Sequence, residues 1–470
     1  MKHWIFERQT PMIDGMAPLA PSRHARGHSG WLAAAGLGLL SCGSTVSLND
    51  AVPTSSSSSS TDASSTDAAG LDTTGLDTTA ATTDLPTALP PVLPPGACPA
   101  ACTLAVDEVW RWDAEPLEPG DPTEVRVTAA STALDGTVIL AEMLDDDPWL
   151  RRIDGTGEQL WRQHADMSCA CEIADLSPNP SGSMMVLGAG PSFGVTHRVV
   201  LGSLDVTGNG FEWLSWTAVL DPEHYRVGSV FSIDGIYSGA LVVDRDLYGP
   251  VEGNEILQVL AYEFDFLIAR EAIDSQPEIL TDRPPVGAPG LENSVAVGFT
   301  DTSFGTPESY VVWLDQFFYP AAVDPLPGPP DAALPSFGAV LFGGLEPLGP
   351  DQPGVHALYV TQSQQDFGLD WTFEATVTAP EASPPALAVD EDGQVTVAVR
   401  TTGEAPEDAA LWLWRLDLQG QLLWSTAVPF APEPGPPPVF IESQGHDVLL
   451  ITTLDGRAHV ERLQPSCACR

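Results

Sequence analysis

The sequence predicts an all-β protein, and two features of its hydrophobic pattern support that prediction. From Cys98 onward, short β-branched and apolar runs alternate with turns rich in Pro, Gly and Asp, and no long stretch has the 3.6-residue period of a helix. Seven of these runs align as repeats that begin 45 to 57 residues apart. A period of this length with strand-like content is typical of β-propeller blades, so we expect seven four-stranded blades. The leading residues of the repeats are Gly136, Gly182, Gly239, Asn293, Gly338, Gly393 and His446.

The two ends of the repeat region predict how the ring closes. The last repeat, from about Pro436, has room for three strands before Cys467. The segment from Leu104 to Ala114, which contains two tryptophans, has the pattern of a lone outer strand. We expect this N-terminal strand to complete the last blade, because the pairing leaves neither end of the ring with an open sheet edge.

A second motif follows several of the repeats. Residues 153–161 and 416–424 both read Ile/Leu-Asp-x-x-Gly-x-x-Leu-Trp, and residues 204–213 contain a looser copy. The Asp-x-x-Gly portion predicts a hairpin turn. The tryptophan is expected to open an outer strand and to pack between neighbouring blades rather than to stack on a sugar.

With these repeats the chain resembles the quinoprotein-like (PQQ-repeat-like) β-propellers. The resemblance is clear in three repeats and implies the propeller fold. It does not imply dehydrogenase chemistry, because the quinone cofactor of true quinoprotein dehydrogenases sits on a disulfide between adjacent cysteines, and this chain has no Cys-Cys pair. No cofactor is therefore expected.

The N-terminal region predicts export and a lipid anchor. Arg23 and Arg26 precede an apolar run at residues 31–40, and the sequence Leu-Leu-Ser-Cys-Gly that ends this region resembles a bacterial lipobox. This resemblance implies a signal peptide at residues 1–41 and acylation of Cys42. Because Gly43 is not Asp, it also implies an outer-membrane lipoprotein of the cell envelope that faces the periplasm or the cell surface.

The next zone, residues 42–97, is rich in Ser, Thr, Asp and Pro and has little apolar content to bury. Such a segment cannot offset its ordering entropy, so we expect a disordered tether. The remaining residues, 98–470, form the predicted propeller domain.

Six cysteines remain once Cys42 is acylated, and they predict disulfides in an oxidising compartment. They form three close pairs: Cys98 and Cys102, Cys169 and Cys171, and Cys467 and Cys469. One hypothesis is a clasp that links the first pair to the last across the ring closure, with Cys169 bonded to Cys171. The alternative is that all three pairs are local.

The charge balance limits the partners. The chain has 64 acidic and 19 basic residues, a net charge of −45. This excess repels nucleic acids and anionic lipid headgroups, and it attracts cations and basic partners. We expect no nucleic-acid partner, and contact with the membrane only through the lipid anchor.

No segment of the sequence predicts a catalytic site. Residues 190–194, Gly-Pro-Ser-Phe-Gly, match a nucleophile elbow, but that elbow needs a following helix and a strand is expected here. Weak calcium candidates are the turn carboxylates Asp145, Asp147, Asp390 and Asp392, although none has the full spacing of a calcium loop. No metal site is therefore expected.

These features favour a membrane-anchored extracytoplasmic binding or scaffold protein with an unidentified protein or glycan partner. One alternative is a propeller enzyme, such as a hydrolase or lyase, with its site at the central channel. The other is an outer-membrane assembly subunit. Propellers have many functions, so the fold alone does not decide among them.

The anchor predicts a defined mass for the mature protein. Unreduced protein purified from the membranes of its host should begin at Cys42, should carry acyl mass and should lack six thiol hydrogens in mass spectrometry. An unlipidated chain with free thiols would contradict the lipoprotein interpretation.

Overall fold

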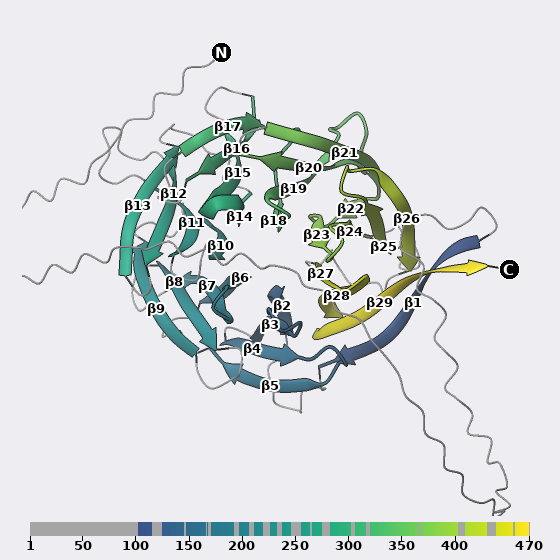
Figure 1. Cartoon of the computed structure of the whole chain (residues 1–470), viewed down its shortest axis with the longest axis horizontal. Helices are drawn as coiled ribbons and strands as arrows, with labels where there is room; N and C mark the ends of the chain where they lie inside the picture. The colour runs from purple at the N-terminus through teal and green to yellow at the C-terminus, as the bar shows by residue number, and fades with distance from the viewer. Residues whose placement is uncertain are drawn as a thin grey trace, which may run out of the picture. The chain divides into compact units, whose positions relative to one another are not determined.

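The structure, a computed structural model, contains seven antiparallel sheets in its described part, arranged as the blades of a β-propeller (Figure 1). The predicted signal peptide 1–41, with the following tether 42–97 that contains Cys42, lies outside the described residues. All described residues belong to the unit Asp84–Arg470. They are residues 102–114, 125–144, 147–165, 167, 171–191, 197–205, 211–219, 226–232, 237–245, 255–263, 266–274, 283–301, 306–315, 320–365, 368–402, 409–429, 439–454 and 456–469.

The first three blades follow one another along the chain, each with its first strand nearest the centre of the ring (Figure 1). Blade one is β2 (Val125–Thr132), β3 (Val138–Leu144), β4 (Asp147–Ile153) and β5 (Gln159–His164). Blade two is β6 (Glu172–Pro178), β7 (Ser183–Pro191), β8 (His197–Asp205) and β9 (Phe211–Val219). Blade three is β10 (Arg226–Ser232), β11 (Tyr237–Arg245), β12 (Glu255–Glu263) and β13 (Phe266–Asp274).

Blades four to six continue the pattern, and the first strand of blade six is split in two. Blade four is β14 (Val286–Pro289), the 3-10 turn η1 (Leu291–Asn293), β15 (Val295–Asp301), β16 (Glu308–Leu314) and β17 (Pro320–Pro325). Blade five is β18 (Ala332–Ser336), β19 (Ala339–Pro347), β20 (Val355–Gln364) and β21 (Gly368–Thr378). Blade six is β22 (Glu381–Ala382), β23 (Ala386–Val389), β24 (Val395–Thr402), β25 (Ala410–Leu416) and β26 (Leu422–Pro429). In the described part of the chain, no helix is long and apolar enough to cross a membrane.

Blade seven combines the two ends of the propeller. It contains β27 (Phe440–Gln444), β28 (Asp447–Leu454) and β29 (Arg457–Cys469) from the C-terminal end and β1 (Cys102–Asp113) from the N-terminal end. In Figure 1, β1 runs beside β29 at the rim. The antiparallel register extends from Cys102 opposite Cys469 to Asp113 opposite His459. The predicted seven-bladed propeller with an N-terminal closing strand is confirmed.

The aligned apolar runs are the second strands of the seven blades: β3, β7, β11, β15, β19, β24 and β28. Four of their leading glycines, at 136, 182, 338 and 393, have a positive φ between 77° and 93°. Asn293 takes the same role in blade four with a φ of 63°. These residues turn the chain sharply between the first and second strands, because the left-handed region is open mainly to Gly and Asn.

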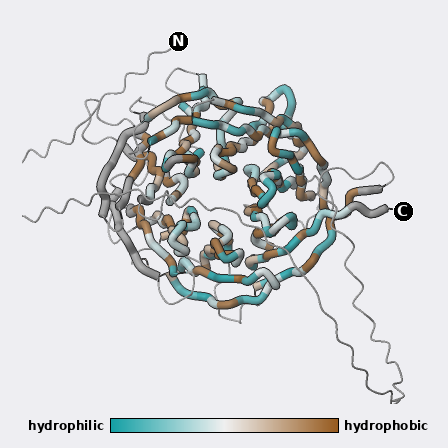
Figure 2. Tube along the Cα trace, viewed as in Figure 1, coloured by the Kyte–Doolittle hydropathy of each residue, from teal (hydrophilic) through white to brown (hydrophobic). Residues whose placement is uncertain are grey.

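The hydrophobic core is divided among the junctions between blades. Each of the seven core clusters in the described residues combines side chains from two neighbouring blades. The outer strand β21 alternates hydrophobic with hydrophilic residues, and Figure 2 shows both kinds interspersed along the rim of the ring. The ring therefore depends on every blade having a neighbour on both sides.

The register of the closing strand predicts one disulfide of the clasp. Cys102 and Cys469 are direct partners in the antiparallel pair, and directly opposed Cα atoms lie about 4.5–5.5 Å apart, within the range that a disulfide needs. Cys467 lies opposite Leu104. Cys171 is disulfide-bonded and buried, whereas Cys98 and Cys169 lie outside the described residues.

We therefore predict a Cys102–Cys469 disulfide, to be detected by peptide mapping without reduction. The Cys102→Ser/Cys469→Ser double variant should lose about 2–4 kcal/mol of unfolding free energy, because the bond links the two ends of the ring. A Cys98–Cys102 linkage in the peptide map would contradict the clasp.

Candidate functional site

One face of the propeller is built from tight hairpins. Consecutive strands are antiparallel, so the turns from first to second and from third to fourth strand lie at the same edge of each blade. We call the face that these turns form the hairpin face. It contains the Asp-x-x-Gly turns that the sequence predicts.

At this face, two tryptophans that lie outside the Asp-x-x-Gly motif each contact the turn glycine of a motif in the next blade. The ring of Trp110 in blade seven lies against Gly157 in blade one, where an added Cβ would come within 2.8 Å of it. Trp110 Nε1 donates a hydrogen bond of 3.0 Å to the carbonyl oxygen of Gly155. Trp371 of blade five lies in the same way against Gly420 of blade six.

The motif tryptophans themselves pack between blades, as predicted. Trp161 lies against the core cluster shared by blades one and two, and Trp424 against the cluster shared by blades six and seven.

Three neighbouring blades also share an arginine that reaches from the third strand to the inner hairpin. Arg152 in blade one pairs with Asp135, and Arg415 in blade six pairs with Asp390. Arg462 in blade seven lies 2.6 Å from Asp447. This set was not predicted from the sequence, although an Arg followed by Ile or Leu recurs at 152, 415 and 462 and is a signal for it.

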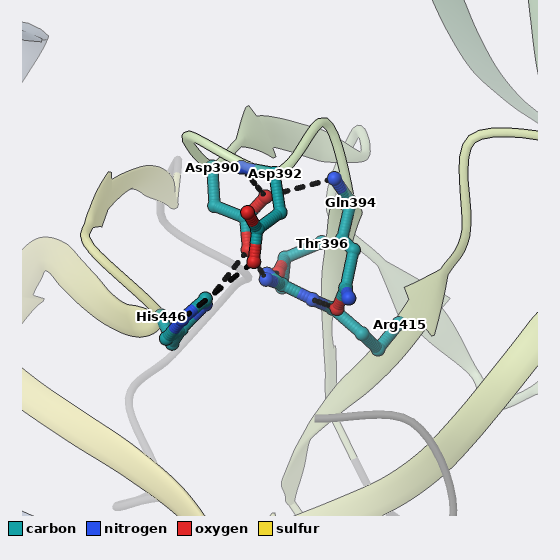
Figure 3. Close-up of polar contacts among 6 residues, drawn as sticks. All are labelled: Asp390, Asp392, Gln394, Thr396, Arg415 and His446. Carbon is teal, nitrogen blue, oxygen red and sulfur yellow. Dashed lines mark hydrogen bonds and ion pairs between the residues drawn. The ribbon is translucent and has the colours of Figure 1, made fainter. Parts of the chain in front are cut away.

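The pair in blade six belongs to a polar cluster on the hairpin face (Figure 3). Asp390 Oδ1 accepts hydrogen bonds from the backbone nitrogens of Asp392 (3.0 Å) and Gln394 (2.8 Å). Its Oδ2 accepts from Arg415 Nη2 and lies 3.3 Å from His446 Nδ1 of blade seven. His446 Nε2 lies 3.7 Å from Asp392 Oδ2. Burial lowers the pKa of Arg415, and the nearby Asp390 charge opposes that shift.

This cluster has the residue types of a metal site, but its oxygens are already engaged. Single ligand atoms of Asp390, Asp392 and His446 lie within 4.8 Å of one another. However, two backbone N–H groups hold one oxygen of Asp390, and the Arg415 guanidinium contacts the other. A cation bound there would face that fixed positive charge at close range. The arrangement therefore fits an ion-paired joint between blades six and seven.

Of the other two calcium candidates, Asp145 lies outside the described residues. Asp147 begins β4 of blade one, with its side chain 75% exposed and its carboxylate 4.0 Å from His164 Nε2. Among the three candidates that the structure describes, Asp390 and Asp392 lie together on one hairpin.

The nucleophile-elbow motif lies between two strands. β7 ends at Pro191, which is opposite His197 at the start of β8. Ser192 itself lies outside the described residues. Because a strand follows where the elbow needs a helix, the flanking elements are those of the predicted hairpin loop.

Next to the polar cluster, the hairpin face exposes three large apolar side chains. They are Leu291 (61% exposed), Phe337 (67%) and Leu418 (45%), and we call them the apolar patch. Leu291 of blade four lies against Gly338 of blade five, so that an added Cβ there would collide with it. Phe337 and Leu418 both lie against Gly393 of blade six. The patch thus spans three consecutive blades.

Phe337 also has an unfavourable backbone conformation. It is one of two non-glycine residues with positive φ in the described part of the chain, at 37°, and it precedes Gly338 at 88°. Ser336 and Ala339 pair across this two-residue turn, and turns of this kind strongly prefer Asn-Gly. A bulky aromatic in the left-handed region costs about 1–3 kcal/mol. Neither core burial nor turn preference explains a phenylalanine here.

Two buried carboxyl groups lie on the first strands, near the centre of the ring. Asp175 of β6 accepts hydrogen bonds from the backbone nitrogens of Leu176 (2.9 Å) and of Val230 (2.8 Å) in the next blade. Burial outweighs these bonds and raises the pKa of Asp175 to about 7. Burial likewise raises the pKa of Glu442 of β27 to about 7, beside Thr132 of the next blade. Asp175 thus directly links blade two to blade three.

A cavity of about 440 Å³ lies at the opposite edge of blades four and five. Prolines and backbone form much of its wall, and its ionisable side chains are Glu308, Tyr310 and Glu346. The Tyr310 hydroxyl donates to Glu308. The cavity thus lies on the face opposite the apolar patch.

Comparison with known proteins identifies no family. No protein-family model matches the chain, and no curated protein matches it. Among solved structures, BamB from Moraxella catarrhalis is 11% identical, with a TM-score of 0.41 over 77% of this chain and 98% of BamB. Prolyl oligopeptidase B from Galerina marginata is also 11% identical, with a TM-score of 0.41 over 71% of this chain and 48% of the peptidase.

The raised pKa of Asp175 predicts how stability depends on pH. The folded protein holds this proton up to about pH 7, whereas the unfolded chain loses it near pH 4. Its contribution to the unfolding free energy therefore falls as the pH rises from about 4 to about 7.

Relative to wild type, the Asp175→Asn variant should thus be more stable near pH 8 than near pH 5, by about 1–2 kcal/mol. Urea unfolding at the two pH values measures this difference. Asp154→Asn is the control, because hydrogen bonds from Thr156 and nearby backbone N–H groups lower the pKa of that exposed carboxyl, so it titrates below this window. An equal effect of Asp175→Asn at both pH values would contradict the assignment.

Proposed function

We propose that the protein is a membrane-anchored extracytoplasmic binding or scaffold protein that docks a partner protein through the apolar patch of the hairpin face. The predicted signal peptide 1–41 would direct export, and the acylated Cys42 would hold the mature protein at the outer membrane. The predicted tether of about 55 residues would give the propeller a reach of roughly 40 Å from that anchor.

Phe337 is the single observation that carries this proposal. Its side chain is 67% exposed, and its backbone has a conformation that an asparagine would adopt at lower cost. Residues that break a local rule without a structural gain cluster at functional sites. Large aromatic side chains are also enriched among the residues that dominate the energy of protein interfaces.

The neighbours of Phe337 strengthen the argument. Leu291 and Leu418 are exposed in the same region and rest on glycines of adjacent hairpins. Scattered apolar side chains are normal on a protein surface, whereas a contiguous group with a polar rim marks an interaction site. A rigid propeller would present such a group with little ordering cost on binding.

The enzyme alternative has one observation in its favour, the two carboxyl groups with raised pKa values near the channel. Perturbed carboxyl groups are frequent at active sites. Here, however, Asp175 is tied by a hydrogen bond to the neighbouring blade, which supports a structural role. An outer-membrane assembly subunit would be a special case of the proposed scaffold.

The Phe337→Asn variant separates binding from folding. It creates the preferred Asn-Gly turn, so the melting temperature should stay the same or rise. Loss of the aromatic anchor should weaken partner binding by about tenfold or more. Thermal unfolding and quantitative co-purification from the membranes of the host measure the two effects.

Leu348→Asn is the matched control. Leu348 is an exposed apolar residue, 47% accessible, in the turn between β19 and β20 at the opposite edge of blade five. This variant should leave co-purification unchanged. If Phe337→Asn retains every partner that wild type co-purifies, the proposed docking surface is wrong.

A further inference from the structure

We infer that the occupant of the hairpin face is a basic protein segment, in which an apolar side chain that contacts Phe337 is flanked by Lys or Arg. This inference rests on the proposed function and adds the chemistry of the partner to it. It follows from the apolar patch together with the charges at its edge.

The apolar part of the occupant follows from the shape of the patch. Phe337 comes from the inner hairpin of blade five and Leu418 from the outer hairpin of blade six, and both rest on Gly393. Leu291 adds a third apolar side chain from blade four, against Gly338 of the same Phe-Gly turn. An aliphatic or aromatic side chain of the partner would lose its water shell by contact with these three residues.

The basic part follows from the hairpin that contains Gly393. Its tip carries Glu391 and Asp392, which are exposed, the side chain of Asp392 by 58%. Arg415 is 1% exposed and already paired with Asp390, and the His446 ring, 32% exposed, lies 3.7 Å from Asp392 Oδ2. In the outer hairpin of the same blade, Asp417 Oδ1 accepts hydrogen bonds from the backbone nitrogens of Gln419 (2.9 Å) and Gln421 (2.8 Å). Glu391 and Asp392 are therefore the charges at the patch that face solvent in this hairpin.

The charge of the whole chain acts in the same direction. A net charge of −45 draws basic segments toward the surface and repels acidic ones. The general attraction gives no specificity, because every exposed acidic residue contributes to it. The combination of the apolar patch with Glu391 and Asp392 is what would select one segment.

A display library of random peptides tests the inference directly. The full-length protein is the bait, and peptides that bind the Phe337→Asn variant are removed first. Both baits have the same charge, so this step removes peptides that bind through the overall acidity alone. The remaining peptides should combine an aromatic or aliphatic anchor with neighbouring Lys or Arg.

Charge variants give the second measurement. The selected peptides should bind the Glu391→Gln/Asp392→Asn double variant about fivefold more weakly than wild type. A double change of acids far from the patch, Asp107→Asn/Glu108→Gln in β1, should leave their affinity unchanged. Both of these control residues are exposed.

The outcomes separate the two proposals. If no peptide distinguishes wild type from Phe337→Asn, the docking surface itself is wrong. If peptides depend on Phe337 but show no excess of Lys or Arg, or bind the charge variant as tightly as wild type, the docking surface stands and the basic partner is wrong.

Discussion

The pairing of β1 with β29 is the constraint on which the rest of the propeller depends. The hydrophobic core consists of clusters at the junctions between blades, and two of these clusters include side chains of β1: Trp110 and Trp112 at one junction and Val106 at the other. Without the N-terminal strand, blade seven would lose its outer edge and both junctions would be exposed to water. Because the closing strands come from opposite ends of the chain, His459 contacts Asp113 across 346 residues, and such a contact carries a high loop-closure entropy.

The arginine–aspartate pairs of the hairpin face recur around the ring closure. Arginines at 152, 415 and 462 lie in blades one, six and seven, the three that surround the closure. Each links a third strand to an inner hairpin of its own blade, and His446 extends the blade-six pair into blade seven. Of these three pairs, the one in blade six is buried on both sides, with Arg415 1% and Asp390 0% exposed. Such a pair contributes little net stability, but removal of one partner leaves an uncompensated buried charge.

Much of the fold could be predicted from the sequence, because the same hydrophobic pattern recurs in each blade. The second strands, the turn glycines and the closing strand all follow from local hydrophobicity and spacing. The split first strand of blade six, around residues 383–385, was not predicted, because only the second strands had been aligned.

The candidate site was harder to predict from the sequence than the fold. Asp390 and Asp392 were named as calcium candidates, but their partners Arg415 and His446 come from other strands, and sequence spacing does not bring such residues together. Phe337 was missed because its backbone conformation appears only in three dimensions.

If one partner segment contacts Phe337, site-specific photo-crosslinking at that residue should capture it. Residue 337 would be replaced by a photoreactive phenylalanine analogue, with position 348 at the opposite edge as the control, and irradiated in membranes of the native host. We expect a crosslink from position 337 to one protein, at an apolar residue flanked by Lys or Arg, and none from position 348. Crosslinks from position 348 alone, or from 337 to an acidic segment, would show that Phe337 is not the contact of a basic partner.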